Sequence, residues 1–161
     1  MEAIKIRPIQ HKDNAAVASI VREVLMEMGA PKVGTAYEDV TLDTRYEVYQ
    51  DQDSGYFVLE ENDKIIGGGG IAKLQGGDTG VCELKKMYFL PEARGRGLGL
   101  EMISKCLEFA KQIGYTSCYL ETMPYMEAAR GLYAKVGFKP LEGPMGDTGH
   151  HSCQTWMIKE L

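Results

Sequence analysis

The stretch FLPEARGRGLGLEM, residues 89–102, constrains the fold of this chain more than any other feature. It stands between an apolar, strand-like run that ends at Leu90 and a helix-like run from Leu98 to Ala110. A strand, a glycine-rich turn and a helix together point several unpaired backbone N–H groups at one spot, where the helix dipole favours an anion. Glycine lets the backbone approach closely, and Arg94 and Arg96 add positive charge. The stretch therefore predicts a phosphate-binding loop.

Two common phosphate loops do not fit. A Rossmann loop needs G-x-G-x-x-G, but the third glycine would fall on Leu100 or Met102, counting from Gly95 or Gly97. Glu121 does end the next predicted strand, as a ribose-binding acid would, yet three antiparallel strands precede the loop in place of a parallel βαβ unit. A Walker loop requires Gly-Lys-Ser/Thr, which is absent from the sequence. A Rossmann-like nucleotide binder is therefore disfavoured.

Hydrophobic periodicity around the loop predicts alternating strands and helices. Asp13 is expected to cap a first helix that Gly29 ends, and a loop with a partial helix is expected from there to residue 51. A second helix after the loop should end at Gly114, and a third should begin near Pro124 and end at Gly137. The predicted strands are residues 3–9, 55–61, 65–74, 81–90, 116–122, 138–141 and 153–161. Four consecutive glycines, residues 67–70, indicate tight sheet packing or a bulge.

The loop does match R-x-x-G-x-G, as Arg94, Gly97 and Gly99, and in this the sequence resembles the GNAT-type N-acetyltransferases. The segment ELKKMYFLPEARGRGLG resembles the family's fourth strand and cofactor loop, and GLYAKVGF resembles its later helix. The order of the predicted elements is similar to that fold over nearly the whole chain. The resemblance implies an α+β (α/β), single-domain GNAT-like acyltransferase fold over residues 1–161. Its mixed, mostly antiparallel central sheet should have about six to seven strands, flanked by about four helices.

The resemblance further implies acetyl-CoA as co-substrate and no metal. The loop would hold the pyrophosphate, and the main chain of the strand before it would bind the pantetheine arm. The expected cofactor-binding residues are Met87, Tyr88, Phe89, Arg94, Gly95, Arg96, Gly97, Leu98, Gly99 and Leu100.

Two residues are candidate catalysts. Tyr133 by itself would more often be a packing residue, but in this family a tyrosine at that place often stands beside the thioester sulfur and protonates the departing thiolate. Seven residues before it the family often carries an asparagine, where this chain has Met126. Glu83 lies eleven residues ahead of the loop's first arginine, where some relatives keep a general base. The alternative for Glu83 is a surface ion pair with a neighbouring lysine.

Composition excludes several partners. The net charge of -5 and an isoelectric point near 5.3 argue against nucleic acid, because phosphate backbones need a basic face. No apolar run approaches the roughly 18 residues of a membrane helix, so no membrane partner is expected. Four widely spaced cysteines without a CxxC pair fit reduced thiols, and we expect a cytoplasmic protein. The cluster His150, His151 and Cys153 fits a polar loop or a substrate-pocket lining better than a zinc site, since no second ligand pair is suitably spaced.

The leading interpretation is an acetyl-CoA-dependent N-acetyltransferase in which a small-molecule or protein amine attacks the thioester directly. Amino acids, polyamines, antibiotics and protein amino groups are all open as acceptors, and Glu38, Asp39 and Asp43 favour a cationic one. A homodimer is allowed. The alternative from another class is a catalytically weak CoA-binding sensor or partner-binding module, which a transfer assay would distinguish.

Overall fold

The computed structural model describes residues 4–33, 35, 37, 39, 41–123, 126–149 and 155–161. These residues form a seven-stranded sheet in the order β1-β2-β3-β4-β5-β7-β6. The strands are β1 (Ile4–Pro8), β2 (Gly55–Glu61), β3 (Lys64–Lys73), β4 (Val81–Phe89), β5 (Ser117–Thr122), β6 (Lys139–Leu141) and β7 (Thr155–Glu160). Only β4 and β5 pair in parallel, so the predicted mixed, mostly antiparallel sheet is confirmed.

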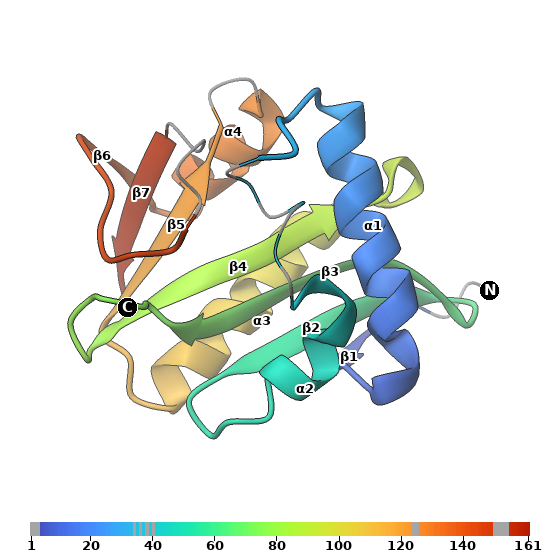
Figure 1. Ribbon diagram of the computed structural model, residues 1–161, viewed down its shortest axis with the longest axis horizontal. Helices are drawn as coiled ribbons and strands as arrows, with labels where there is room; N and C mark the ends of the chain where they lie inside the picture. The colour runs from blue at the N-terminus through green and yellow to red at the C-terminus, as the bar shows by residue number, and fades with distance from the viewer. Residues whose placement is uncertain are drawn as a thin grey trace.

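Four α-helices lie within the described residues, as predicted. They are α1 (Asn14–Glu27), α2 (Arg45–Val48), α3 (Leu98–Gln112) and α4 (Glu127–Lys135). The first two cover one face of the sheet and α3 covers the other (Figure 1). The structure begins α4 at Glu127, after the predicted start at Pro124, which lies outside the described residues.

Burial of the apolar stripe of α3 holds this helix against the sheet. Met102, Ile103, Cys106 and Ala110 recur at helical spacing and are each fully buried. Burying a side chain such as Met or Ile stabilises a fold by roughly 1.5–3 kcal/mol. The free cysteines Cys82, Cys106 and Cys118 are buried in this core, which supports the prediction of reduced thiols for these three, while Cys153 lies outside the described residues.

The glycine run in β3 leaves room for large side chains on both faces of the sheet. A Cβ on Gly67 would lie 2.3 Å from the ring of Phe89, and a Cβ on Gly68 would lie 2.8 Å from the ring of Tyr56. The pairing of β3 with β4 also shifts register between Gly68 and Gly70, which marks a bulge. The predicted tight packing is confirmed, and the bulge occurs with it.

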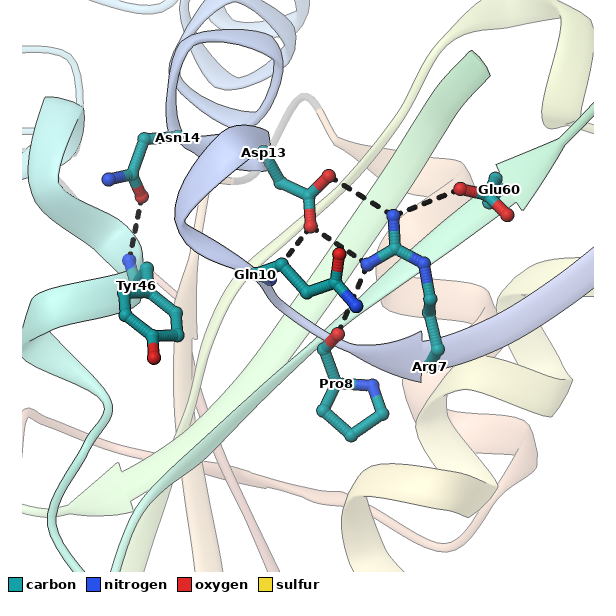
Figure 2. A network of polar contacts seen from close by, with 7 residues as sticks. All are labelled: Arg7, Pro8, Gln10, Asp13, Asn14, Tyr46 and Glu60. Atoms are coloured by element: carbon teal, nitrogen blue, oxygen red, sulfur yellow. Dashed lines mark hydrogen bonds and ion pairs between the residues drawn. The ribbon is translucent and has the colours of Figure 1, made fainter. Parts of the chain in front are cut away.

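Arg7 fixes the start of α1 against the sheet (Figure 2). Its Nη1 and Nη2 donate to the two carboxylate oxygens of Asp13 (2.8 and 3.1 Å), and Nη2 also donates to Oε1 of Glu60 in β2 (2.9 Å). Asp13 occupies the N-cap position of α1, as predicted, but its side chain does not cap that helix. It accepts the backbone N–H of Gln10 instead (2.7 Å), so it stabilises the turn that leads into α1.

Candidate active site

The candidate site lies where β4 and β5 separate. Their pairing consists of Val81 with Ser117, Cys82 with Cys118, and Glu83 with Tyr119, and it ends there although both strands continue (Figure 1). A cavity of about 610 Å³ occupies the region beyond. It is bordered by most of β4, the glycine-rich loop, the start of α3, the end of β5, α4, Val24 of α1 and Met28 directly after α1. The interrupted parallel pair therefore positions the site.

The glycine-rich loop presents the start of α3 to this cavity. Gly95 and Gly97 have φ of +73° and +76°, in the left-handed region that favours glycine, and Gly97 is the N-cap residue of α3. A Cβ on Gly99 would lie 2.9 Å from Leu132, so glycine there lets α3 approach α4 closely. The first N–H groups of a helix have no partner within the helix, and the helix dipole favours an anion beside them. This end of the cavity is therefore suited to an anionic group.

The two loop arginines are both ion-paired within the chain. Arg94 borders the cavity, but its guanidinium pairs with Glu27 at the end of α1, with N–O distances of 2.7 and 2.9 Å. This hydrogen bonding raises the pKa of Arg94 and lowers that of Glu27. Arg96 does not line the cavity and pairs with Glu61 of β2, with an Nη2–Oε2 distance of 2.6 Å. Both positive charges are thus already matched by carboxylates of this chain.

Glu83 and Lys86 place charge on the β4 wall. Glu83 is 4% exposed and lines the cavity. Its Oε1 lies 3.9 Å from Nζ of Lys85, so the ion pair given as the alternative is present but long, and Glu83 is buried in place of lying at the surface. Lys86 sits at the bulge with φ of +53°, and its buried Nζ contacts Oδ2 of Asp39 (2.5 Å). Burial lowers the pKa of Lys86 to about 8, and the charge of Asp39 opposes that decrease. Sequence reasoning missed Lys86, because nothing in a strand pattern reveals a left-handed lysine.

Tyr133 lines the same cavity from α4. Its ring is buried and packs edge-on against Phe138, with 5.9 Å between centroids. Burial raises the pKa of Tyr133 far above its ordinary value of 10, with smaller contributions from the thiols of Cys106 and Cys118. Met126 also lines the cavity and accepts the hydroxyl of Thr122 at its sulfur (3.6 Å). A thioether therefore stands where the family often has an amide.

The acidic residues expected to attract a cationic acceptor are partly used elsewhere. Asp39 pairs with Lys86, and Asp43 pairs with both terminal nitrogens of Arg22 (2.9 and 2.8 Å). Glu38 lies outside the described residues. Sequence reasoning also missed Arg45, which is 1% exposed on α2 and stacks over the ring of Tyr49 at 5.5 Å. Because Asp39 and Asp43 are paired with cationic side chains of this chain, they give no support to a preference for cationic amine acceptors.

Within the described residues no three His, Cys, Asp or Glu side chains are grouped so that they could hold a metal ion. His150, His151 and Cys153 lie outside those residues. None of the described helices is both long and apolar enough to span a membrane.

Comparison with known proteins gives matches along nearly the whole chain. The profile of the Acetyltransferase (GNAT) family matches residues 21–138. The uncharacterized N-acetyltransferase YjgM of Escherichia coli (strain K12) is 39% identical over 157 residues, which cover 97% of this chain and 94% of YjgM.

Solved structures share the fold at lower identity. A GNAT-family acetyltransferase from Staphylococcus aureus Mu50 superposes with a TM-score of 0.87 at 18% identity, covering 98% of this chain and 99% of that one. The paia N-acetyltransferase of Thermoplasma acidophilum, solved in complex with coenzyme A, gives a TM-score of 0.75 at 19% identity, covering 99% of each chain.

Proposed function

The chain belongs to the GNAT family of acetyltransferases, and from this membership we propose that it transfers the acetyl group of acetyl-CoA to a primary amine by direct attack. The observation that carries the proposal is a single cavity that brings together the glycine-rich loop, Glu83 and Tyr133. Acetyl-CoA supplies an activated thioester, so the chain needs to bind it, orient it and move protons. We also propose that residues 1–161 form one acetyltransferase domain.

The loop and β4 are suited to hold the two ends of the cofactor. Apart from their chain neighbours, no atom of the described residues lies within 4 Å of where a Cβ on the left-handed Gly95 or Gly97 would be, so an anion can come close to the backbone. Beyond Glu83 the β5-facing side of β4 is not covered by β5. The main chain of Met87–Phe89 can therefore hydrogen-bond an extended pantetheine arm as a strand would. These assignments fit acetyl-CoA at this site.

Glu83 is proposed as the general base. An ammonium group must lose a proton before its nitrogen can attack a carbonyl carbon. Glu83 stands on the cavity wall just where β5 departs, and its carboxylate can take this proton directly or through a water. Its burial favours its role, because charges act more strongly in a site shielded from water.

Tyr133 is proposed as the general acid that protonates the departing thiolate. The phenol is protonated at neutral pH, and although burial raises its pKa, the same desolvated site makes a developing thiolate a stronger base, so donation to the sulfur is feasible. No hydrogen bond of its hydroxyl occurs among the described residues, so donating would break no existing contact. The buried ring fixes where the hydroxyl stands.

The test is a transfer assay with a panel of amines, in which the release of free CoA thiol is followed for each acceptor. Turnover with at least one amine, together with a rise in melting temperature on adding CoA, is the expected result. CoA binding without turnover on any amine would favour the sensor. If the protein neither bound CoA nor turned over any amine, the proposed function would be contradicted. The cytoplasmic location and the homodimer stay predictions.

A further inference from the structure

The guanidinium of Arg94 is almost fully used within the protein. Its Nη1 and Nη2 donate to Oε2 and Oε1 of Glu27 (2.7 and 2.9 Å). Its Nε and Nη2 donate to the backbone oxygen of Phe89 (3.1 and 2.8 Å). A guanidinium has five N–H donors, so these four bonds leave little for a phosphate. Arg94 thus connects the loop to the last residue of α1 and to the last residue of β4.

Arg96 anchors the other side of the loop. Its Nη1 and Nη2 donate to the carboxylate of Glu61 at the end of β2 (3.2 and 2.6 Å), and Nη1 also donates to the backbone oxygen of Glu92 (3.1 Å). Arg96 is absent from the cavity lining. Its charge therefore acts on the side of the loop away from the cavity.

The left-handed residue Gly95 lies between these two arginines, and the left-handed residue Gly97 directly follows the second. Glycine has the largest backbone freedom, so fixing it in one conformation costs more conformational entropy than fixing any other residue. If the loop were free, binding an anion would have to supply that ordering. Anchors on α1, β4 and β2 supply it in advance, which is how preorganisation raises affinity.

We infer that Glu27 and Glu61 are positioning residues for acetyl-CoA: through Arg94 and Arg96 they hold the glycine-rich loop in its anion-binding form. This inference rests on the proposed function. Both ion pairs are partly exposed, with side-chain exposures of 34% and 39% for Arg94 and Glu27 and of 32% and 14% for Arg96 and Glu61. Each pair therefore contributes little to global stability. The two ion pairs instead keep the loop ordered, and this order raises its affinity for the cofactor.

The opposite assignment predicts the opposite sign. If Arg94 were a direct phosphate ligand, Glu27 would compete with the phosphate for it, and removing Glu27 would tighten CoA binding. If Glu27 is an anchor, removing it weakens CoA binding. The direction of the change in affinity therefore separates the two assignments.

The experiment compares Glu27→Ala and Glu61→Ala with Asp43→Ala. Asp43 forms a similar two-contact ion pair with Arg22 of α1, but away from the loop, so its variant reports the effect of losing a surface ion pair on this helix. CoA affinity is measured by calorimetry, KM for acetyl-CoA and kcat by thiol release, and folding by melting temperature. We expect Glu27→Ala and Glu61→Ala to weaken CoA binding and raise KM roughly three- to tenfold with kcat within about twofold, while Asp43→Ala leaves CoA affinity unchanged.

A double-mutant cycle completes the test. Because Glu27 acts through Arg94, adding Glu27→Ala to Arg94→Ala should produce no further loss of affinity. Unchanged or tighter CoA binding by Glu27→Ala, additive losses in the cycle, or an equal loss in Asp43→Ala would each overturn the inference while leaving the proposed function intact. A wild type that does not bind CoA would contradict the proposed function, and this inference with it.

Discussion

Replacing Tyr133 by phenylalanine isolates one hydroxyl group. The ring that packs against Phe138 is retained, and the hydroxyl makes no hydrogen bond among the described residues, so the variant should unfold at nearly the wild-type temperature. If Tyr133 protonates the thiolate, its hydroxyl acts mainly in the transition state, and its loss should appear in kcat with KM for acetyl-CoA little changed. General-acid catalysis is typically worth roughly 100- to 10,000-fold, or about 2.7–5.4 kcal/mol of barrier.

An ordinary hydrogen bond to the cofactor would be worth only about 0.5–1.5 kcal/mol, or roughly two- to thirteenfold, so the two roles differ in size. Acetyl-CoA and amine are titrated independently for wild type and variant. The matched control is Tyr115→Phe, whose hydroxyl donates to the backbone oxygen of Asp53 (2.7 Å) outside the cavity lining. That variant should lose about 1 kcal/mol of stability and keep its kcat. A kcat loss below tenfold in Tyr133→Phe, or a loss confined to KM, would refute the general-acid role.

Three further variants test the rest of the site and the fold. Gly97→Val should abolish the rise in melting temperature that CoA causes. A β-branched residue is strained at φ of +76°, and its side chain would fill the open space beside the loop. A rise as large as in the wild type would show that no anion binds there. Glu83→Gln should lower turnover at neutral pH and recover partly at high pH, where more acceptor is free amine; an unchanged pH–rate profile would remove Glu83 as base. Asp13→Asn should lower the free energy of unfolding by roughly 3 kcal/mol at neutral pH in urea titrations. Burial raises the pKa of Asp13, but hydrogen bonds from Arg7 and Gln10 lower it below 3.8, so the wild-type advantage should be present above about pH 4 and be lost as the pH falls through the folded pKa; a difference that persists in acid would contradict this.

Most helices and strands could be predicted, because their signals are local. The continuous apolar run of β2 and the helical stripe of α3 each depend on residues within a few positions of one another. The region between α1 and β2 was predictable only as a loop with a partial helix, and the structure has a 3-10 turn followed by the short α2 there. Its only strongly buried charged residue in the described part, Arg45, is held by tertiary packing, which no local pattern reveals.

The sequence predicted which residues form the candidate site better than it predicted which partners those residues contact. With the exception of Arg96, every catalytic or cofactor-binding residue proposed from the sequence borders one cavity. Asp39 illustrates what was missed: the sequence shows a loop carboxylate, and the structure pairs it with a lysine that a bulge turns out of the regular strand alternation. A bulge depends on the register between β3 and β4, and register cannot be read from either strand alone.

By itself the sequence determined the left-handed glycine turn before α3, since backbone freedom belongs to the residue and to its immediate neighbours. It also determined that this turn lies between a strand and a helix, and hence that it suits an anion. Only the tertiary structure decided where the charges of Arg94 and Arg96 go, because the partner of a long cationic side chain is whichever acceptor the fold brings within about 3 Å. Here the packing of α1 and β2 brings Glu27 and Glu61 to that distance, although both lie far from the loop in the sequence.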